Sequence, residues 1–124
     1  MDLIKLGANE ALKMMEEGTL SSEEYTKAFL RQIELREDQV GAWIFLDPKL
    51  ALEQAREADK KWKNKNPGKL NGLPIGIKDI IDTKDMPTEN GSQLCKDRKP
   101  SKDAHLVKLL RNEGAVILGK CVTT

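Results

Sequence analysis

The sequence GLPIGIKDIID at residues 72–82 is an apolar run in a chain of which 33% of the residues are charged. Its isoleucines are β-branched and it opens with a glycine and a proline, so we expect a β-strand. Side chains alternate along a strand, which places Ile75 and Ile77 on one face and Gly76 and Lys78 on the other. Lys78 then shares its face with a residue that has no side chain, and this leaves room for another group to approach the backbone.

Two interpretations of Lys78 follow from this pattern. In the first, the apolar strand holds the amine out of water, which is costly unless the lysine is paired or neutral and would mark a functional group. In the second, the run is an edge strand and Lys78 points into water, where a lysine discourages pairing with another sheet. The strand alone leaves both interpretations open.

The bulk composition bounds the class of protein. A chain of 124 residues forms one domain at most, with a modest core. The 21 basic and 20 acidic residues are interspersed and give a net charge of +1. This balance argues against nucleic-acid contacts and against a polybasic membrane surface. No apolar run approaches the roughly 20 residues that a membrane span needs, and the N-terminus lacks a signal-peptide pattern, so we expect a cytoplasmic protein.

The residues that could ligate a metal are few and scattered. Cys95 and Cys121 lack metal-ligand spacing, and the single histidine is His105. We therefore expect neither a metal site nor a cofactor. Two free thiols in a reducing compartment are the expected state of the cysteines, with a disulfide between them as the alternative.

Three helices are expected before the central run. The first spans about residues 4–17 and is closed by Gly18. The second opens with a capping box, Ser21-Ser22-Glu23-Glu24, and carries an apolar stripe of Tyr25, Phe29 and Ile33. The third begins at Asp47-Pro48 and runs to about residue 63, with small alanines that indicate close packing. Residues 41–46 between the last two form a strand or an extended link.

A second strand is expected downstream. Residues 82–102 form a long polar connection, a kind of loop that is usually functional or disordered. Ser101 or Asp103 is expected to cap a fourth helix that ends at Gly114, with His105 at its surface. Residues 115–118 then form a buried strand that we expect to be central. Strand, helix and strand make a βαβ unit with parallel strands.

The predicted fold class is therefore α/β, with N-terminal helices followed by a βαβ unit. A soft boundary divides residues 1–66, a helical lead, from residues 67–124, an α/β segment that contains the lysine strand. Two parallel strands with one crossover helix leave an open edge and an uncovered face. We expect a sheet that is truncated before it is complete.

These residues resemble the amidase signature family. The resemblance rests on the following segments: LPIGIKD at 73–79, DMPT at 85–88, GS at 91–92, DA at 103–104 and GAVILGK at 114–120. It covers nearly the whole chain. The family comprises serine hydrolases that cleave or transfer carboxamides through a Ser–cis-Ser–Lys triad, and it includes a component of glutamyl-tRNA(Gln) amidotransferase. The implied fold is a mixed sheet covered by helices, of which this chain carries the first part.

The resemblance assigns the catalytic base. Lys78 corresponds to the lysine of the triad, and burial would lower its pKa so that it can accept a proton. Both serines of the family lie downstream of Thr124, while Ser92 and Ser101 match no family motif. Lys120 follows a structural strand and is given no catalytic role.

The resemblance also implies the partners. We expect an N-terminal portion of an amidase that is inactive alone. Its partners would be the remainder of the amidase domain, a small-molecule amide in the complete enzyme, and a second copy of the chain in a homodimer. The alternative is a non-catalytic binding or interaction module derived from the amidase fold, whose open sheet edge accepts a strand.

Overall fold

The computed structural model describes residues 1–123 and confirms the α/β class. Its elements are, in chain order, a 3₁₀ turn (Leu3–Lys5), α1 (Ala8–Glu17), α2 (Ser22–Val40), β1 (Trp43–Leu46), α3 (Pro48–Lys63), β2 (Pro74–Lys78), a 3₁₀ turn (Gln93–Cys95), α4 (His105–Asn112) and β3 (Val116–Cys121). The extended link expected at residues 41–46 is thus a strand, β1. The first helix begins four residues later than expected.

The ends of the first three helices have the predicted chemistry. Gly18 closes α1 in the left-handed region, with φ of 80°. At the start of α2, Ser21 Oγ accepts a hydrogen bond of 3.0 Å from the backbone N–H of Glu24. Asp47 Oδ1 accepts one of 3.2 Å from the N–H of Leu50 at the start of α3. Local sequence therefore contributes to each of these boundaries. At the start of α2, the Asp59 carboxylate of α3 also accepts from the N–H groups of Ser22 and Glu23.

The expected cap of α4 is wrong. Ala104 occupies the cap position and offers no side-chain hydrogen bond there. The carboxylate of Asp103 is engaged elsewhere, because Oδ1 accepts from the N–H of Lys84 at 2.9 Å and Oδ2 pairs with Arg111 Nε at 3.0 Å. Ser101 is exposed. Asp103 thus ties the loop after β2 to the side of α4 and leaves the helix end uncapped.

The three strands form one mixed sheet in the order β1-β3-β2. β2 and β3 are parallel, with α4 as the crossover helix, which confirms the βαβ unit. β1 adds an antiparallel strand on the far side of β3, with Phe45 opposite Lys120. β3 is therefore central, as expected, and β2 is an edge strand.

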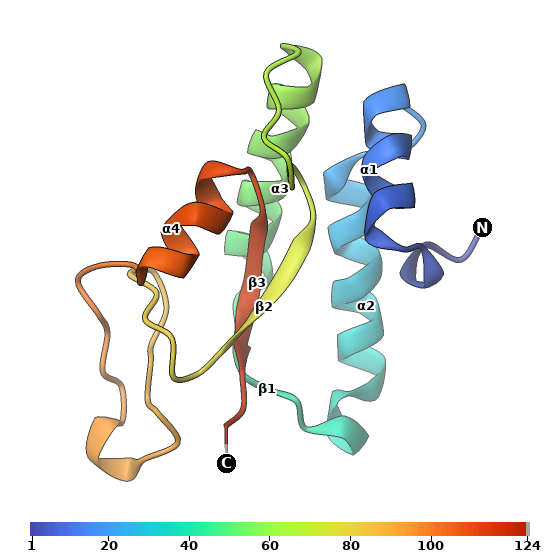
Figure 1. The fold of residues 1–124 in the computed structure, drawn as a ribbon. Coiled ribbons are helices and arrows are strands. Elements are labelled where there is room, and N and C mark those ends of the chain that lie inside the picture. The colour runs from blue at the N-terminus through green and yellow to red at the C-terminus, as the bar shows by residue number, and fades with distance from the viewer. Residues whose placement is uncertain (124) are drawn as a thin grey trace.

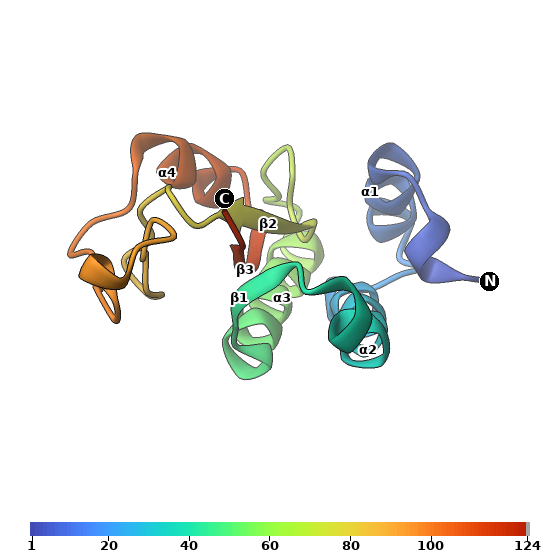
Figure 2. The ribbon, with the colours of Figure 1, turned by 90° about the horizontal axis from the view of Figure 1, so that it is seen from below.

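Helices lie on both sides of this sheet (Figures 1 and 2), and the buried residues divide accordingly. On one side, Ala51 and Ala55 of α3 pack against Val116 and Leu118. The alanines let α3 approach β3 closely, as their small size predicted. On the side of α4, the cluster consists of Ile77, Met86, Val107 and Ile117. A further cluster joins α1 and α2 to the residues before β2: Ala11, Met15, Leu20, Tyr25 and Leu73.

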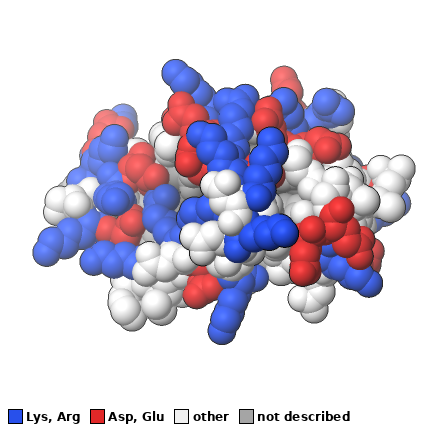
Figure 3. Space-filling view, turned by 90° about the horizontal axis from the view of Figure 1, so that it is seen from above, with Lys and Arg blue, Asp and Glu red and all other residues white. Residues whose placement is uncertain are grey.

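On the face seen from above, lysine and arginine side chains lie among acidic ones, with uncharged residues between them (Figure 3). None of the helices within residues 1–123 has both the length and the apolar character needed to cross a bilayer. Over the same residues, no three His, Cys, Asp or Glu side chains are grouped so that they could hold a metal ion.

Candidate active site at the end of the Lys78 strand

Lys78 is the last residue of β2, and its side chain is exposed to solvent. The alternation along the strand is as predicted, since Gly76 is also exposed while Ile77 is buried against the α4 side. The expectation that the strand holds Lys78 out of water is wrong. β2 is an edge strand, and α4 covers its isoleucine face, so the amine of Lys78 extends into water.

The space beside Gly76 is occupied by groups from the other two strands. A Cβ placed on Gly76 would lie 2.8 Å from Cys121 Sγ and 2.8 Å from the ring of Trp43. Because Gly76 has no side chain, the indole ring of Trp43 on β1 has room to extend over β3 as far as β2. Both cysteines are free thiols, as expected, and burial raises the pKa of Cys121. Lys78 lies two residues beyond Gly76, at the open end of the strand, and pairs with Cys121.

Asp79, the next residue, is buried and held by several bonds. Its backbone N–H donates to Cys121 O at 2.9 Å and its carbonyl accepts from the N–H of Asn90 at 3.0 Å. Its carboxylate accepts from the N–H of Glu89 at 3.2 Å through Oδ2. Oδ1 lies 3.4 Å from Lys120 Nζ. The peptide that follows Lys78 is thus fixed both to β3 and to residues 89–90 of the long loop.

Lys120 is the residue that sequence reasoning undervalued. It lies on β3 and its side chain is fully buried. Burial lowers the pKa of Lys120, and the neighbouring Asp79 carboxylate partly opposes this shift. The available signal was a lysine inside a near-continuous apolar run of a central parallel strand, where a charged side chain needs partners.

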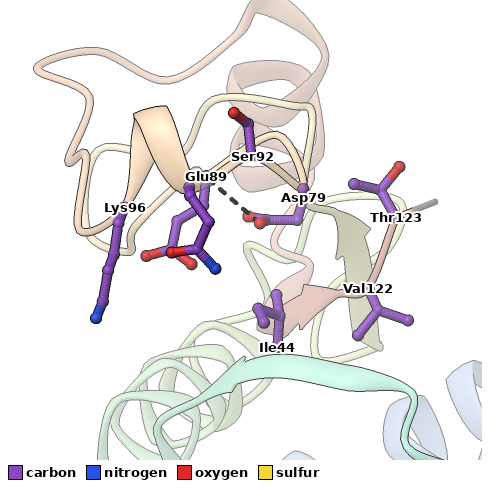
Figure 4. A pocket seen from close by; sticks show the side chains of 9 residues that line it. Ile44, Asp79, Glu89, Ser92, Lys96, Val122 and Thr123 are labelled. Carbon is purple, nitrogen blue, oxygen red and sulfur yellow. Dashed lines mark hydrogen bonds between the residues drawn. The ribbon is translucent and has the colours of Figure 1, made fainter.

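A cavity of about 300 Å³ opens beside Asp79, at the carboxyl ends of the two parallel strands (Figure 4). Its walls come from three regions of the chain: Ile44, Asp79, Glu89, Gly91, Ser92, Gln93, Lys96, Val122 and Thr123. Figure 4 shows the Asp79 carboxylate directed toward Glu89. Lys78 is not among these lining residues. The cavity and the amine therefore lie at the same end of β2 but are separate features.

The long loop after β2 is ordered by an ion pair. The two terminal nitrogens of the Arg98 guanidinium, Nη1 and Nη2, donate to the carboxylate of Asp82 at 2.9 and 3.2 Å. This pair lowers the pKa of Asp82. The backbone N–H of Thr88 also donates to Arg98 O at 2.9 Å. The two arms of the loop are thereby joined near their base.

Three of the four serines within residues 1–123 are bonded to backbone groups, and the fourth, Ser101, is exposed. Ser22 Oγ donates to Gly72 O at 2.8 Å, and Ser92 Oγ accepts from the N–H of Leu94 at 3.2 Å. Within residues 1–123, no hydrogen bond joins a serine hydroxyl to Lys78. His105 is exposed at the start of α4, as expected. The structure thus brings together a lysine, a buried aspartate and an open strand end, with no serine hydroxyl of residues 1–123 bonded to the amine.

Comparison with known proteins places these features in a family. The family description Amidase matches residues 24–124. The chain is 39% identical over 119 residues to the A component of glutamyl-tRNA(Gln) amidotransferase from Dehalococcoides mccartyi, covering 96% of this chain and 24% of that protein. For the same component from Clostridium botulinum the identity is 38% over 121 residues, with 97% and 25% covered. The chain therefore spans about a quarter of the length of these relatives.

Solved structures agree with this assignment. The peptide amidase of Stenotrophomonas maltophilia superposes with a TM-score of 0.88 at 34% identity, over 94% of this chain and 24% of that one. The arrangement of α1 to α4 around the mixed sheet is therefore the arrangement found in about a quarter of that enzyme.

Proposed function

Because the chain belongs to the amidase family, we propose that it is the N-terminal portion of an amidase that hydrolyses or transfers carboxamides. The observation that carries the proposal is the end of β2, where Lys78 leaves the strand from an open face beside the firmly held Asp79. The match of residues 24–124 and the quarter-length coverage support it. In this proposal residues 1–66 are the helical lead and residues 67–124 carry the lysine strand.

Lys78 is the base in the proposed mechanism. By the family resemblance, it takes a proton, through a second serine in a cis peptide, from the serine that attacks the amide carbonyl. The amine or ammonia leaves, and water or another acceptor takes the acyl group. Backbone amides of the serine-bearing segment stabilise the oxyanion.

The exposure of Lys78 determines what this mechanism requires. A lysine that serves as a base must be shielded from water, because water favours the charged form. A segment that covers the open face of β2 would exclude water from Lys78. The same segment would bring the serine hydroxyls. We therefore propose that the remainder of an amidase domain is the first partner of this chain, and that the 124 residues alone are inactive.

The test uses the longest polypeptide that the gene encodes, assayed for ammonia release from a panel of small primary carboxamides. Lys78→Ala should lower kcat by at least about 10³-fold, because a triad member is lost. Lys78→Arg should be equally inactive, since arginine keeps the charge but cannot be deprotonated. The matched control is Lys63→Ala, which removes an exposed lysine at the end of α3.

Two results would contradict the proposal. One is full activity of Lys78→Ala together with normal activity of the Lys63→Ala control. The other is amidase activity of the isolated 124 residues at a rate comparable to the longer polypeptide.

A second candidate function is a non-catalytic interaction module. The edge position of β2 and the exposed side chains of Lys78 and Ile80 favour it, because an edge strand can accept a strand from a partner. This candidate requires the 124-residue chain to be a cooperatively unfolding monomer. It also requires that the gene encode no glycine- and serine-rich segment after Thr124. Aggregation of the isolated chain would count against it.

A further inference from the structure

Lys120 is the largest fully buried side chain among residues 1–123. A buried ammonium is costly unless its charge and its three N–H donors are satisfied. Its Nζ donates to Thr88 Oγ1 at 2.7 Å, to Pro87 O at 3.0 Å and to Thr83 Oγ1 at 3.2 Å. Asp79 Oδ1 supplies the opposite charge at 3.4 Å. We call these five residues the Lys120 cluster.

In the Lys120 cluster, oxygen atoms surround Nζ, and the Asp79 carboxylate supplies an opposite charge. Thr83 Oγ1 donates its proton to Met86 O at 3.3 Å, and Thr88 Oγ1 donates to Ile81 O at 3.5 Å. With their protons directed to these carbonyls, both hydroxyl oxygens accept from Lys120. A general base needs access to substrate, and the fully buried side chain of Lys120 lacks it, so Lys120 is not assigned that role.

All the acceptors of Lys120 lie on the turn that follows Lys78. This turn runs from Asp79 to Thr88, while Lys120 belongs to the central strand β3. Asp79 is also bonded to the backbone of Glu89 and Asn90. Because Asp79 is joined to Lys78 by one peptide bond, the cluster determines the direction in which the Lys78 side chain leaves β2.

We propose that Lys120 is a positioning residue that holds the turn from Asp79 to Thr88 against β3 and thereby aims Lys78. This inference rests on the proposed role of Lys78 as the base. Lys120 acts through Asp79 and the turn, and it contacts no substrate.

The test compares Lys120→Met with Lys63→Met in the longest polypeptide that the gene encodes. Methionine keeps most of the volume of Lys120 but removes its charge and donors. We expect kcat to fall by about 10- to 100-fold with KM unchanged, as a displaced reacting group implies. Amide hydrogen exchange at Glu89 and Asn90 should accelerate, because both amides bond to Asp79. The Lys63→Met control should change neither quantity.

A double variant separates positioning from simple stabilisation. In Asp79→Asn/Lys120→Met no unpaired carboxylate is buried, so thermal stability should recover relative to Lys120→Met. The bonds to Thr83, Pro87 and Thr88 remain missing, so kcat should stay low. Recovery of kcat together with stability would overturn the proposal.

A milder substitution covers the case in which Lys120→Met does not fold. Thr88→Val removes the acceptor at 2.7 Å, and we expect a smaller decrease of kcat and faster exchange at Glu89. Normal kcat and normal exchange in Thr88→Val would overturn the proposal.

The two proposals fail in different ways. Loss of activity in Lys78→Ala with normal kcat in Lys120→Met refutes only the positioning role. Full activity in Lys78→Ala refutes the role of Lys78 itself, and the exchange measurement still decides whether Lys120 holds the turn.

Discussion

Gly114 offers a sharp test of how the βαβ unit is held together. It lies between α4 and β3 with φ of 86°, and its carbonyl accepts from the N–H of Gly72 at 2.8 Å just before β2. A Cβ at this position would lie 2.8 Å from Asn71 Cα and would also contact the Asn71 side chain. Asn71 cannot move easily, because it is fully buried and donates to Ala58 O at 2.8 Å.

The cost of Gly114→Ala has two parts. The left-handed backbone costs an alanine about 1 to 2 kcal/mol. Crowding of a packed and hydrogen-bonded neighbour adds about 1 to 3 kcal/mol. We therefore expect the free energy of unfolding to fall by about 2 to 5 kcal/mol in total. Gly18→Ala is the matched control, since Gly18 has φ of 80° but nothing within 4 Å of an added Cβ. It should show the backbone cost alone.

The measurement is urea unfolding of the 124-residue chain, followed by tryptophan fluorescence. Trp62 is a suitable reporter because its Nε1 donates to Asn71 O at 3.2 Å. The difference between the two variants isolates the contact with Asn71, provided that the urea dependence is the same in both. Equal losses in Gly114→Ala and Gly18→Ala would refute the reasoning, since the close approach of Asn71 would then carry no energy.

Three further outcomes are expected. Met86→Ala should lower the free energy of unfolding by about 2 to 5 kcal/mol in urea titrations, because Met86 is fully buried in the α4-side core. Asp47→Ala should lower the free energy of unfolding by about 1 kcal/mol through loss of the α3 cap, whereas Asp47→Ser should retain most of the stability that the cap provides. Arg98 holds the pKa of Asp82 below its ordinary 3.8. This ion pair therefore stabilises the fold above pH 3.8, and its contribution is lost as the pH falls through the lowered pKa of Asp82. Arg98→Gln should flatten this acid dependence of the urea midpoint; an unchanged dependence would contradict it.

Helix boundaries could be predicted from the sequence because their causes are local. A cap such as Asp47 acts on an N–H three residues away, and the left-handed Gly18 ends a helix by its own backbone freedom. The parallel pairing of β2 and β3 was also predictable, because a crossover helix of this length permits little else. Asp103 shows the limit of such reasoning. The sequence predicted that its carboxylate caps α4, but in the structure the carboxylate pairs with Arg111, near the other end of the helix.

The two lysines of the sheet show why burial could not be predicted in the same way. Both Lys78 and Lys120 follow apolar runs. The strand pattern left the burial of Lys78 open, and only the family resemblance implied that Lys78 is buried. The structure has the reverse, with Lys78 exposed and Lys120 fully buried. Burial depends on what covers a face, and that is decided by strand order and by the path of a loop distant in sequence. The turn from Asp79 to Thr88 folds back over β3 and buries Lys120. The pattern of apolar residues within β3 does not predict this.

The division of roles between these lysines follows from their surroundings. The three hydrogen bonds of Lys120 Nζ go to oxygen atoms of the turn from Asp79 to Thr88. Lys120 is therefore suited to hold the backbone of that turn in place. Lys78 has an open face beside it, so its properties depend on what comes to lie there. A covering segment that excludes water would shift Lys78 toward the neutral amine that a base requires. It would change Lys120 less, because the side chain of Lys120 is already fully buried. Under the proposed function, a catalytic site on this chain would combine the open face beside Lys78 with the fixed turn held by Lys120, and the two lysines lie on neighbouring strands.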